Sequence, residues 1–231
     1  MSMIRRSLRT VLALALCLPL LVSCASSTTA SVPVGCEQAG SPCLQGKATV
    51  ELTTSKGSIT LELDGDAAPV TAGNFLDLVK RGTYNGTVFH RVVRDPVPFV
   101  VQGGDPASSD PATPKSQYGT GSFVDPSTGQ ARFVPLELAF KGEDQPRYGR
   151  VVSNPTELLQ LKLSHERGAL AMARSQAPDS ASAQFYIALK PLPELDGRYA
   201  VFGKVLEGLD VVDAIRQDDT IKTAKVLTPG L

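Results

Sequence analysis

The sequence of 231 residues is long enough for one domain, or two small ones, with a full hydrophobic core. Hydrophobic residues make up 42% and charged residues 20% of the chain, which is ordinary for a globular protein. Three of the 23 basic residues lie within residues 1–23, where there is no acid, so 20 basic residues face 23 acidic ones in the remainder. A protein that binds the phosphate backbone of a nucleic acid usually carries an excess of basic residues. The slightly negative balance here excludes that class, and we expect no nucleic-acid partner.

The first 24 residues are typical of an export signal. Three arginines precede an apolar run at 11–22, which is too short to cross about 30 Å of hydrocarbon and fits a secretory signal. The run ends in Leu-Val-Ser-Cys at 21–24, which resembles the lipobox of bacterial lipoproteins. The resemblance implies that 1–23 is removed and that Cys24 carries a lipid, so that the protein is exported and anchored to a membrane on its extracytoplasmic side. The alternatives are an ordinary signal with a coincidental cysteine, or a membrane anchor.

Residues 24–46 are small, polar and turn-forming, and they predict a flexible tether. Outside the cytoplasm, two cysteines as close as Cys36 and Cys43 usually form a disulfide, which we expect here. A metal site is the weaker alternative, because both histidines lie far along the chain. Since the bridge would lie in a free tether, its reduction should leave the stability of the following domain almost unchanged.

From Lys47 onward the pattern becomes strand-like. Residues 48–54 and 58–63 alternate apolar and polar side chains on either side of a short turn, which predicts a hairpin with one buried face. A helix follows, with Pro69 before it, Thr71 as its N-cap and Gly82 beyond its end. Further strands are predicted at 87–93, 99–102, 169–173, 184–189, 200–206 and 221–227, with a second short helix at 209–216.

Residues 105–167 lack such patterns and contain several proline breakers, so we interpret them as long surface loops with one strand near 135–140. Many short strands and two helices predict a mostly β domain, in which a closed or nearly closed antiparallel barrel carries helices over its ends.

The common catalytic motifs are absent: there is no Gly-x-Ser-x-Gly, no phosphate-binding loop and no cluster of histidine and cysteine. His90 and Arg91 are neighbours in an alternating strand, so their side chains point to opposite faces. One of the two must therefore face the working side of the barrel.

Four ordered segments resemble the signature of the cyclophilins, and the similarity covers residues 47–228. They are Phe-His-Arg at 89–91 with Phe-Val-Val-Gln-Gly-Gly-Asp at 99–105, Gly-Ala-Leu-Ala-Met-Ala-Arg-Ser at 168–175 with Ala-Gln-Phe-Tyr-Ile at 183–187, Leu-Asp-Gly at 195–197 with Val-Phe-Gly-Lys-Val at 201–205, and the helix Thr-Ala-Gly-Asn-Phe-Leu-Asp-Leu at 71–78. The resemblance implies a closed eight-stranded antiparallel β-barrel capped by two α-helices. It also implies peptidyl-prolyl cis–trans isomerase activity, here on exported proteins during folding.

The resemblance further implies roles for nine residues. Arg91 falls on the family's catalytic arginine, and Phe99 and Gln102 are grouped with it as catalytic. Among the substrate-binding positions, Val100, Tyr186 and Leu195 line an apolar proline pocket together with Phe99. Gln184, together with Gln102, forms hydrogen bonds with the substrate backbone. Ala173 and Arg174 lie on the strand at the rim, beside the peptide. Taken one at a time, the apolar residues read as core and Arg91 as a solvated strand residue, so the assignment depends on the order of the whole motif.

The chemistry of the reaction suits this set of residues. An Xaa-Pro bond isomerises over a barrier of about 18–20 kcal/mol, and twisting it makes the prolyl nitrogen basic. A donor aimed at that nitrogen helps only in the transition state, and arginine supplies one that stays charged. No metal, nucleotide or other cofactor is needed.

We therefore expect a monomeric enzyme whose partners are proline-containing polypeptides, together with the membrane reached through the lipid anchor. The alternative is a proline-peptide binding module or assembly factor at a membrane surface, with incidental catalysis.

Three positions depart from common cyclophilin patterns. Glu194 stands where many members carry tryptophan, Tyr199 where many carry histidine, and Arg174 where the animal members carry asparagine. The loop at 94–98 is also longer than in compact members, and the expanded stretch at 105–167 could shape the choice of partner.

Overall fold

The computed structural model of the chain describes residues 35–36 and 42–229. The predicted signal at 1–23, the predicted lipidation site Cys24 and most of the predicted tether lie outside the described residues. Within the described part of the chain, no helix is both long and apolar enough to cross a membrane.

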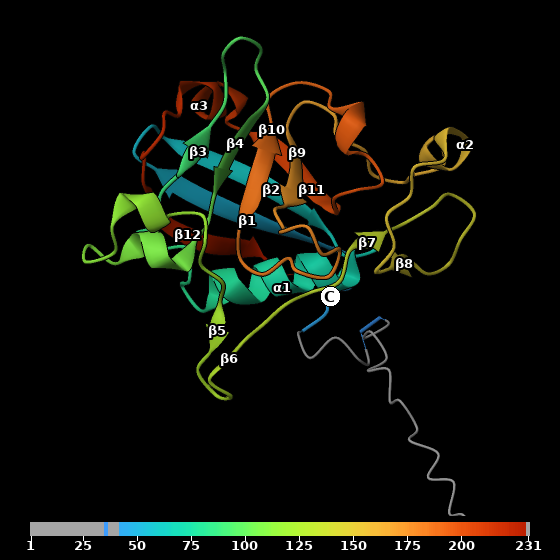
Figure 1. Cartoon of the computed structure of the whole chain (residues 1–231), viewed down its shortest axis with the longest axis horizontal. Helices are drawn as coiled ribbons and strands as arrows, with labels where there is room; N and C mark the ends of the chain where they lie inside the picture. Colours follow the sequence, from blue (N-terminus) through green and yellow to red (C-terminus); the bar gives the residue numbers. More distant parts are fainter. Residues whose placement is uncertain (1–34, 37–41, 230–231) are drawn as a thin grey trace, which may run out of the picture. The chain divides into compact units, whose positions relative to one another are not determined.

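Eight antiparallel strands form one sheet in the order β12-β1-β2-β11-β9-β10-β4-β3 (Figure 1). They are β1 (Lys47–Thr54), β2 (Ser58–Asp64), β3 (Arg91–Val92), β4 (Val100–Gly103), β9 (Ala169–Met172), β10 (Phe185–Ala188), β11 (Val201–Glu207) and β12 (Ile221–Thr228). The predicted hairpin is confirmed by β1 and β2, whose register places Glu51 opposite Thr60. The mostly β character predicted from the sequence is therefore confirmed.

The expectation of a closed barrel is wrong, because the sheet is open between its edge strands β12 and β3. Across this gap the described residues form one isolated bridge, Val88 to Thr220, with flanking backbone hydrogen bonds. The stretch predicted as a strand at 87–93 contains only the two-residue β3, and the chain before β12 turns through Asp218, whose φ is 69°. Because the residues in this turn cannot form regular strand pairing, β12 begins only at Ile221 and does not pair with β3.

The core lies against the sheet between α1 (Pro69–Lys80) and α3 (Leu209–Ala214), which lie toward opposite ends of it in Figure 1. Alternate residues of β1 and β2 are buried, as their period-two pattern predicts. Three aromatic rings surround Phe75 of α1, with the centroids of Tyr84, Phe185 and Phe202 at 4.9, 5.3 and 5.2 Å from its own. These contacts fix β10, which carries Phe185 on its core side and Tyr186 on the other.

The start of α1 differs from the prediction. The helix begins at Pro69, and Thr71 lies inside its first turn instead of capping it. The cap comes from Glu137, whose carboxylate accepts the backbone N–H groups of Val70 at 3.1 Å and Thr71 at 2.8 Å. Glu137 is 1% exposed, and burial raises its pKa although both amide bonds favour the ionised form. A cap 66 residues away along the chain is invisible to local sequence signals.

The stretch at 105–167 contains more structure than the predicted surface loops. It holds two small sheets, β5 (Val124–Asp125) with β6 (Gln130–Ala131) and β7 (Glu137–Leu138) with β8 (Arg147–Tyr148), the short helix α2 (Pro155–Leu158) and two 3₁₀ turns, Pro106–Ser109 and Lys115–Gln117. The strand expected near 135–140 is β7. A separate apolar cluster joins this stretch to Ala200 of the main domain through Leu136, Leu138, Phe140, Val152 and Leu161. Strands of two residues carry no periodicity that a sequence pattern can detect.

The last residues of the predicted tether, 42–46, precede β1, and part of this segment packs against the domain. Leu44 is 3% exposed, and its N–H donates to the Pro69 carbonyl at 3.0 Å. A Cβ on Gly73 of α1 would lie 2.1 Å from the Pro42 carbonyl oxygen, so this close packing needs glycine. A segment of small, turn-forming residues has the same sequence pattern whether it is a free tether or packs against a helix, so the pattern alone cannot distinguish the two.

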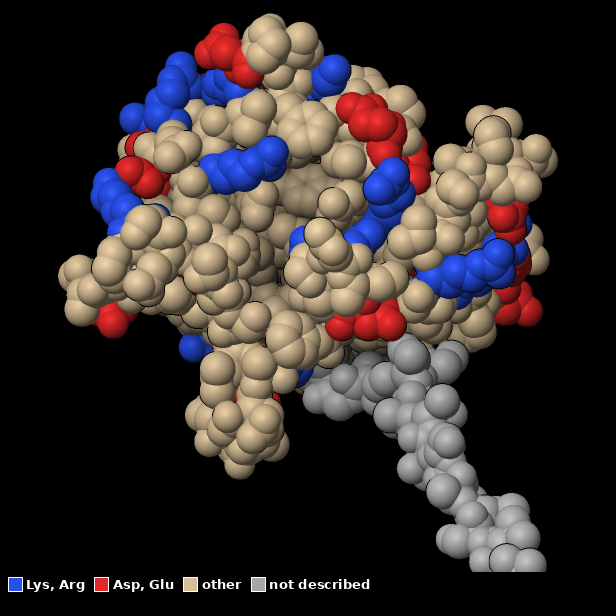
Figure 2. Space-filling view, in the orientation of Figure 1, with Lys and Arg blue, Asp and Glu red and all other residues tan. Residues whose placement is uncertain are grey.

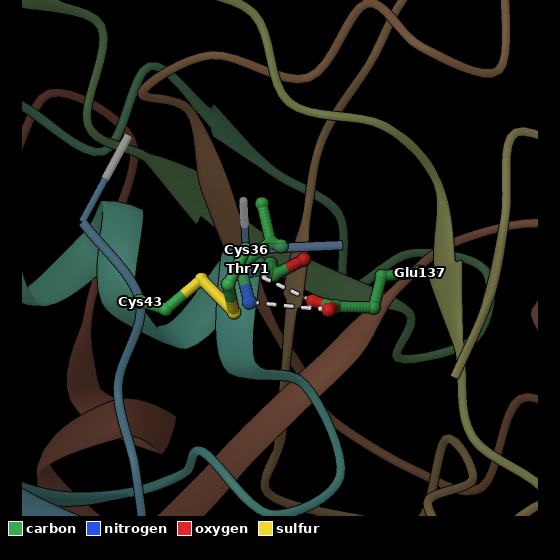
Figure 3. The surroundings of a disulfide bond; sticks show 5 residues. Cys36, Cys43, Thr71 and Glu137 are labelled. Carbon is green, nitrogen blue, oxygen red and sulfur yellow. Dashed lines mark hydrogen bonds between the residues drawn. A yellow bond between two sulfur atoms is a disulfide. The ribbon is translucent and has the colours of Figure 1, made fainter. Parts of the chain in front are cut away.

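A disulfide joins Cys36 to Cys43, with their Cα atoms 5.7 Å apart. Figure 3 shows the bridge beside the start of α1, where Thr71 meets Glu137. The cross-link therefore lies against the domain.

Candidate active site

The nine residues predicted to bind or act on substrate gather on one face of the sheet. Eight of them line a cavity of about 230 Å³, called here the first cavity: Arg91, Phe99, Val100, Gln102, Ala173, Arg174, Tyr186 and Leu195. The ninth, Gln184, lines a second cavity of about 380 Å³, which shares Gln102, Ala173 and Arg174 with the first. Figure 2 shows this face hollowed near its centre, with basic side chains beside the hollow.

Strand register explains why these residues meet. Arg91 of β3 lies opposite Gln102 of β4, Gln102 lies opposite Tyr186 of β10, and Tyr186 lies opposite Ala171 of β9. Residues directly opposite one another project from the same face of a sheet. A single row across three strands thus presents a guanidinium, an amide and an aromatic ring side by side.

Arg91 is exposed at the mouth of the first cavity. Its Nη1 lies 3.4 Å from Gln102 Oε1, and its guanidinium carbon lies 5.8 Å from the centroid of the Phe99 ring. These contacts direct a permanently charged donor along the edge of an apolar wall.

A chain of amides continues from Gln102 into the second cavity. Gln102 Nε2 donates to Gln184 Oε1 at 3.3 Å, and Gln184 Nε2 donates to the Gly121 carbonyl at 2.9 Å. With both ends held, the Gln102 side chain keeps its carbonyl oxygen toward Arg91.

Arg174 lines both cavities. Its guanidinium carbon lies 4.7 Å from the ring centroid of Tyr199, and its Nε donates to the Arg198 carbonyl at 2.9 Å. Tyr199, which from the sequence was only a departure from the family pattern, also lines the first cavity. Its position four residues after Leu195 in the chain was the signal that could have found it.

His165 and Asp196, to which the sequence motifs assigned no role, lie behind the Tyr186 wall of the first cavity. The hydroxyl of Tyr186 contacts His165, which in turn contacts Asp196. Burial raises the pKa of Tyr186 well above its ordinary value, so the phenol stays neutral. No local pattern relates His165 to the other two residues.

Of His90 and Arg91, Arg91 is the one that lines the first cavity. His90 precedes β3 and is not part of a strand, so the predicted alternation of the two side chains remains a prediction. His90 packs against the loop at Gly119, where an added Cβ would lie 3.0 Å from the imidazole ring. Burial lowers the pKa of His90 and so favours the neutral ring.

The chain is similar in sequence to known proteins of one family. Residues 49–229 match the model of the family described as cyclophilin type peptidyl-prolyl cis-trans isomerase/CLD. A putative thylakoid lumen peptidyl-prolyl cis-trans isomerase of Synechocystis is 39% identical over 202 residues, which cover 83% of this chain and 50% of the relative. The chain thus spans about half the length of that protein.

Two further proteins match over most of their length. A peptidyl-prolyl cis-trans isomerase of Helicobacter pylori is 36% identical over 182 residues, which cover 78% of this chain and 87% of the relative. The crystal structure of a Cryptosporidium parvum cyclophilin type peptidyl-prolyl cis-trans isomerase in the presence of the dipeptide Ala-Pro has a TM-score of 0.56 at 25% identity, and the match covers 78% of this chain and 99% of that one.

Proposed function

Because the chain belongs to the cyclophilin-type peptidyl-prolyl cis–trans isomerases, we propose that it accelerates the isomerisation of Xaa-Pro bonds in exported polypeptides. The observation that carries the proposal is the position of Arg91, an exposed charged donor that shares a cavity of about 230 Å³ with the apolar side chains of Phe99, Val100 and Leu195. A proline ring fits such a cavity, and a chain bound there passes beside the guanidinium.

In the proposed mechanism the first cavity holds the proline ring against Phe99, Val100, Tyr186 and Leu195 while the chain on one side of the bond rotates. Twisting removes amide resonance and makes the prolyl nitrogen pyramidal and basic. Arg91 then donates a hydrogen bond to that nitrogen. This bond forms only in the twisted state, so it stabilises the transition state more than the ground state.

The substrate backbone is held by neighbouring groups. Gln102 lies in the same row as Arg91, and we assign it a hydrogen bond to a backbone group next to the proline. The residues before the proline cross the boundary at Ala173 and Arg174 and enter the second cavity, where Gln184 lies.

The setting of the reaction is also part of the proposal. The signal-like run at 11–22 and the lipobox-like end at Cys24 support export and lipid anchoring at an extracytoplasmic membrane surface. The name of the Synechocystis relative places that protein in the thylakoid lumen, which is consistent with export. The clients are then unfolded or partly folded exported chains that contain proline.

The test is a cis-to-trans assay on short Xaa-Pro peptides, comparing the processed protein with Arg91→Ala and with Arg167→Ala, an exposed arginine paired with Asp213 away from the site. Loss of one charged donor costs about 3–4 kcal/mol, so Arg91→Ala should lower turnover by about two to three decades. Peptide affinity should change far less, and Arg167→Ala should behave as the parent protein. Near-normal turnover in a folded Arg91→Ala variant would refute the proposed mechanism. Binding of proline peptides with no turnover in the parent protein would instead favour a binding module.

A further inference from the structure

The hydroxyl of Tyr186 is held by a buried hydrogen-bond chain next to the first cavity. Tyr186 Oη lies 2.9 Å from His165 Nε2, and His165 Nδ1 lies 2.7 Å from Asp196 Oδ1. His165 is 2% exposed. We assign to His165 the tautomer in which Nδ1–H donates a hydrogen bond to Asp196 Oδ1 and Nε2 accepts one from the tyrosine hydroxyl, because this tautomer satisfies both contacts.

Ring packing fixes the orientation of the same tyrosine. The rings of His165 and Tyr186 are nearly parallel, with an interplanar angle of 11° and centroids 5.9 Å apart. On another side Tyr199 meets Tyr186 edge-on, at 82° and 6.0 Å. The hydroxyl is therefore turned toward His165 while the ring contributes to the wall of the cavity.

His165 also holds the opposite wall. Its backbone N–H donates to Asp196 Oδ1 at 2.8 Å, and its carbonyl accepts the N–H of Leu192 at 2.8 Å. These bonds bracket the 3₁₀ turn Pro193–Leu195, which carries Leu195 into the cavity. One buried residue thus joins β10 to the turn that faces it.

The stretch at 136–161 supports this turn from behind. The N–H of Val152 donates to the Gly197 carbonyl at 2.9 Å, and a Cβ on Gly197 would lie 2.3 Å from the Val152 carbonyl oxygen. The turn is therefore pinned on both sides, by His165 and by Val152.

We propose that His165, oriented by Asp196, is a positioning residue that sets the separation between Tyr186 and Leu195 and thereby the fit of the proline ring. The proposal deepens the proposed function and rests on it. His165 touches no reacting atom, so its removal should weaken substrate binding without changing the donor that acts on the twisted bond. The expected signature is a rise in KM at nearly constant kcat.

Four variants separate the two bonds of His165. Tyr186→Phe and His165→Asn both remove the tyrosine bond, because an asparagine amide can reach Asp196 but not the tyrosine hydroxyl. His165→Gln places an amide oxygen near the position of Nε2 and should restore that bond in part. The fourth variant, Tyr84→Phe, is the control, because Tyr84 is also buried, its hydroxyl donates to the Ala183 carbonyl at 2.9 Å, and neither residue lines the first or the second cavity.

We expect KM to rise about three- to tenfold in Tyr186→Phe and His165→Asn, the range that one ordinary hydrogen bond allows, with kcat within about twofold. His165→Gln should show a smaller rise, Tyr84→Phe none, and the double variant Tyr186→Phe/His165→Asn no more than either single one. Unchanged KM in both single variants, or an equal rise in Tyr84→Phe, would overturn the proposal.

Two further readouts keep the inference separate from the proposed function. Ring ¹⁵N shifts should show the Nδ1–H tautomer for His165, and the sequence has only two histidines, so the His165→Gln spectrum assigns the signal. An Nε2–H tautomer would contradict the chain of bonds. If the parent protein had no turnover, the proposed function would fail, whereas the Kd of a proline peptide would still report the positioning effect.

Discussion

Arg91 and Gln102 face each other across the β3–β4 pair, and the Gln102 carbonyl oxygen lies 3.4 Å from the arginine Nη1. Gln102 is held in turn by Gln184, whose amide donates to the Gly121 carbonyl. The direction of the proposed catalytic donor therefore depends on a glutamine chain that begins in the loop before β5.

Gln102→Ala should lower kcat/KM about tenfold, since it removes one hydrogen bond to a charged group. If Gln102 acts by directing Arg91, the double variant Arg91→Ala/Gln102→Ala should be no slower than Arg91→Ala alone. The exposed Gln130 of β6 gives the control Gln130→Ala, which should leave kcat/KM unchanged. Fully additive losses in the double variant would show that Gln102 acts on the substrate independently of Arg91.

The disulfide should stabilise the folded domain, contrary to the expectation drawn from the sequence. Cys43 packs against the core next to the buried Leu44, so the loop closed by the bridge has one end anchored on α1. For a sequence separation of 7, the chain-entropy model gives about 2.5 kcal/mol. At about 2–4 °C per kcal/mol for a domain of this size, Cys36→Ser/Cys43→Ser should lower Tm by roughly 5–10 °C. An unchanged Tm would mean that the bridge constrains only a free tether.

The buried cap of α1 predicts a pH dependence. Burial raises the folded-state pKa of Glu137 above its ordinary value, so its protonated form favours folding, and this contribution is lost as pH rises through the folded pKa. The free energy of unfolding of the parent protein relative to Glu137→Gln should therefore fall as pH rises above about 4.5. Glu143→Gln is the control, because a hydrogen bond from Arg147 lowers the pKa of Glu143. The free energy of unfolding of the parent protein relative to Glu143→Gln should therefore change with pH in the opposite direction. Chemical denaturation at several pH values measures the free energy of unfolding of the parent protein and of both variants. A difference between the parent protein and Glu137→Gln that stays constant with pH would contradict the prediction.

The sequence predicted those parts of the fold that are set by local pattern. The alternation in β1 and β2 and the proline and glycine around α1 both follow from short-range geometry. The open edge of the sheet does not, because it depends on where the turn at Asp218 places β12 relative to β3. The cap from Glu137 likewise arises only once β7 lies against α1.

The same division holds for the site. The predicted residues came from an ordered motif, and strand register then explains why Arg91, Gln102 and Tyr186 meet. His165 and Asp196 are 31 residues apart and lie on different loops, so their contact depends on tertiary packing. Residues whose function is to hold another side chain are hard to detect in one sequence for this reason.

The lipid anchor remains a prediction from the lipobox-like sequence. Cys24→Ser should abolish incorporation of labelled lipid and alter processing of the signal, because the modified cysteine becomes the first residue after cleavage. Mass spectrometry of the mature N-terminus measures both effects. A mature chain that starts elsewhere without lipid mass would refute the anchor and leave the isomerase proposal untouched.

Cyclosporin should bind this protein weakly compared with cyclophilins that carry tryptophan at the position of Glu194. Glu194 is exposed in the 3₁₀ turn beside Leu195, a residue of the first cavity. A tryptophan there offers an indole N–H donor and an apolar cover, whereas a carboxylate has no donor and loses its water at a cost of several kcal/mol when apolar drug surface covers it. Catalysis should survive, since Glu194 does not line the cavity.

The measurement is inhibition of the parent protein and of Glu194→Trp with one peptide substrate, with Glu194→Gln as the control for charge alone. Glu194→Trp should be inhibited at a lower cyclosporin concentration than the parent, and Glu194→Gln should fall between them because it is neutral and its amide can donate. Inhibition of the parent as tight as that of Glu194→Trp would show that position 194 does not reach the bound drug. The turn Pro193–Leu195 would then present only Leu195 to ligands.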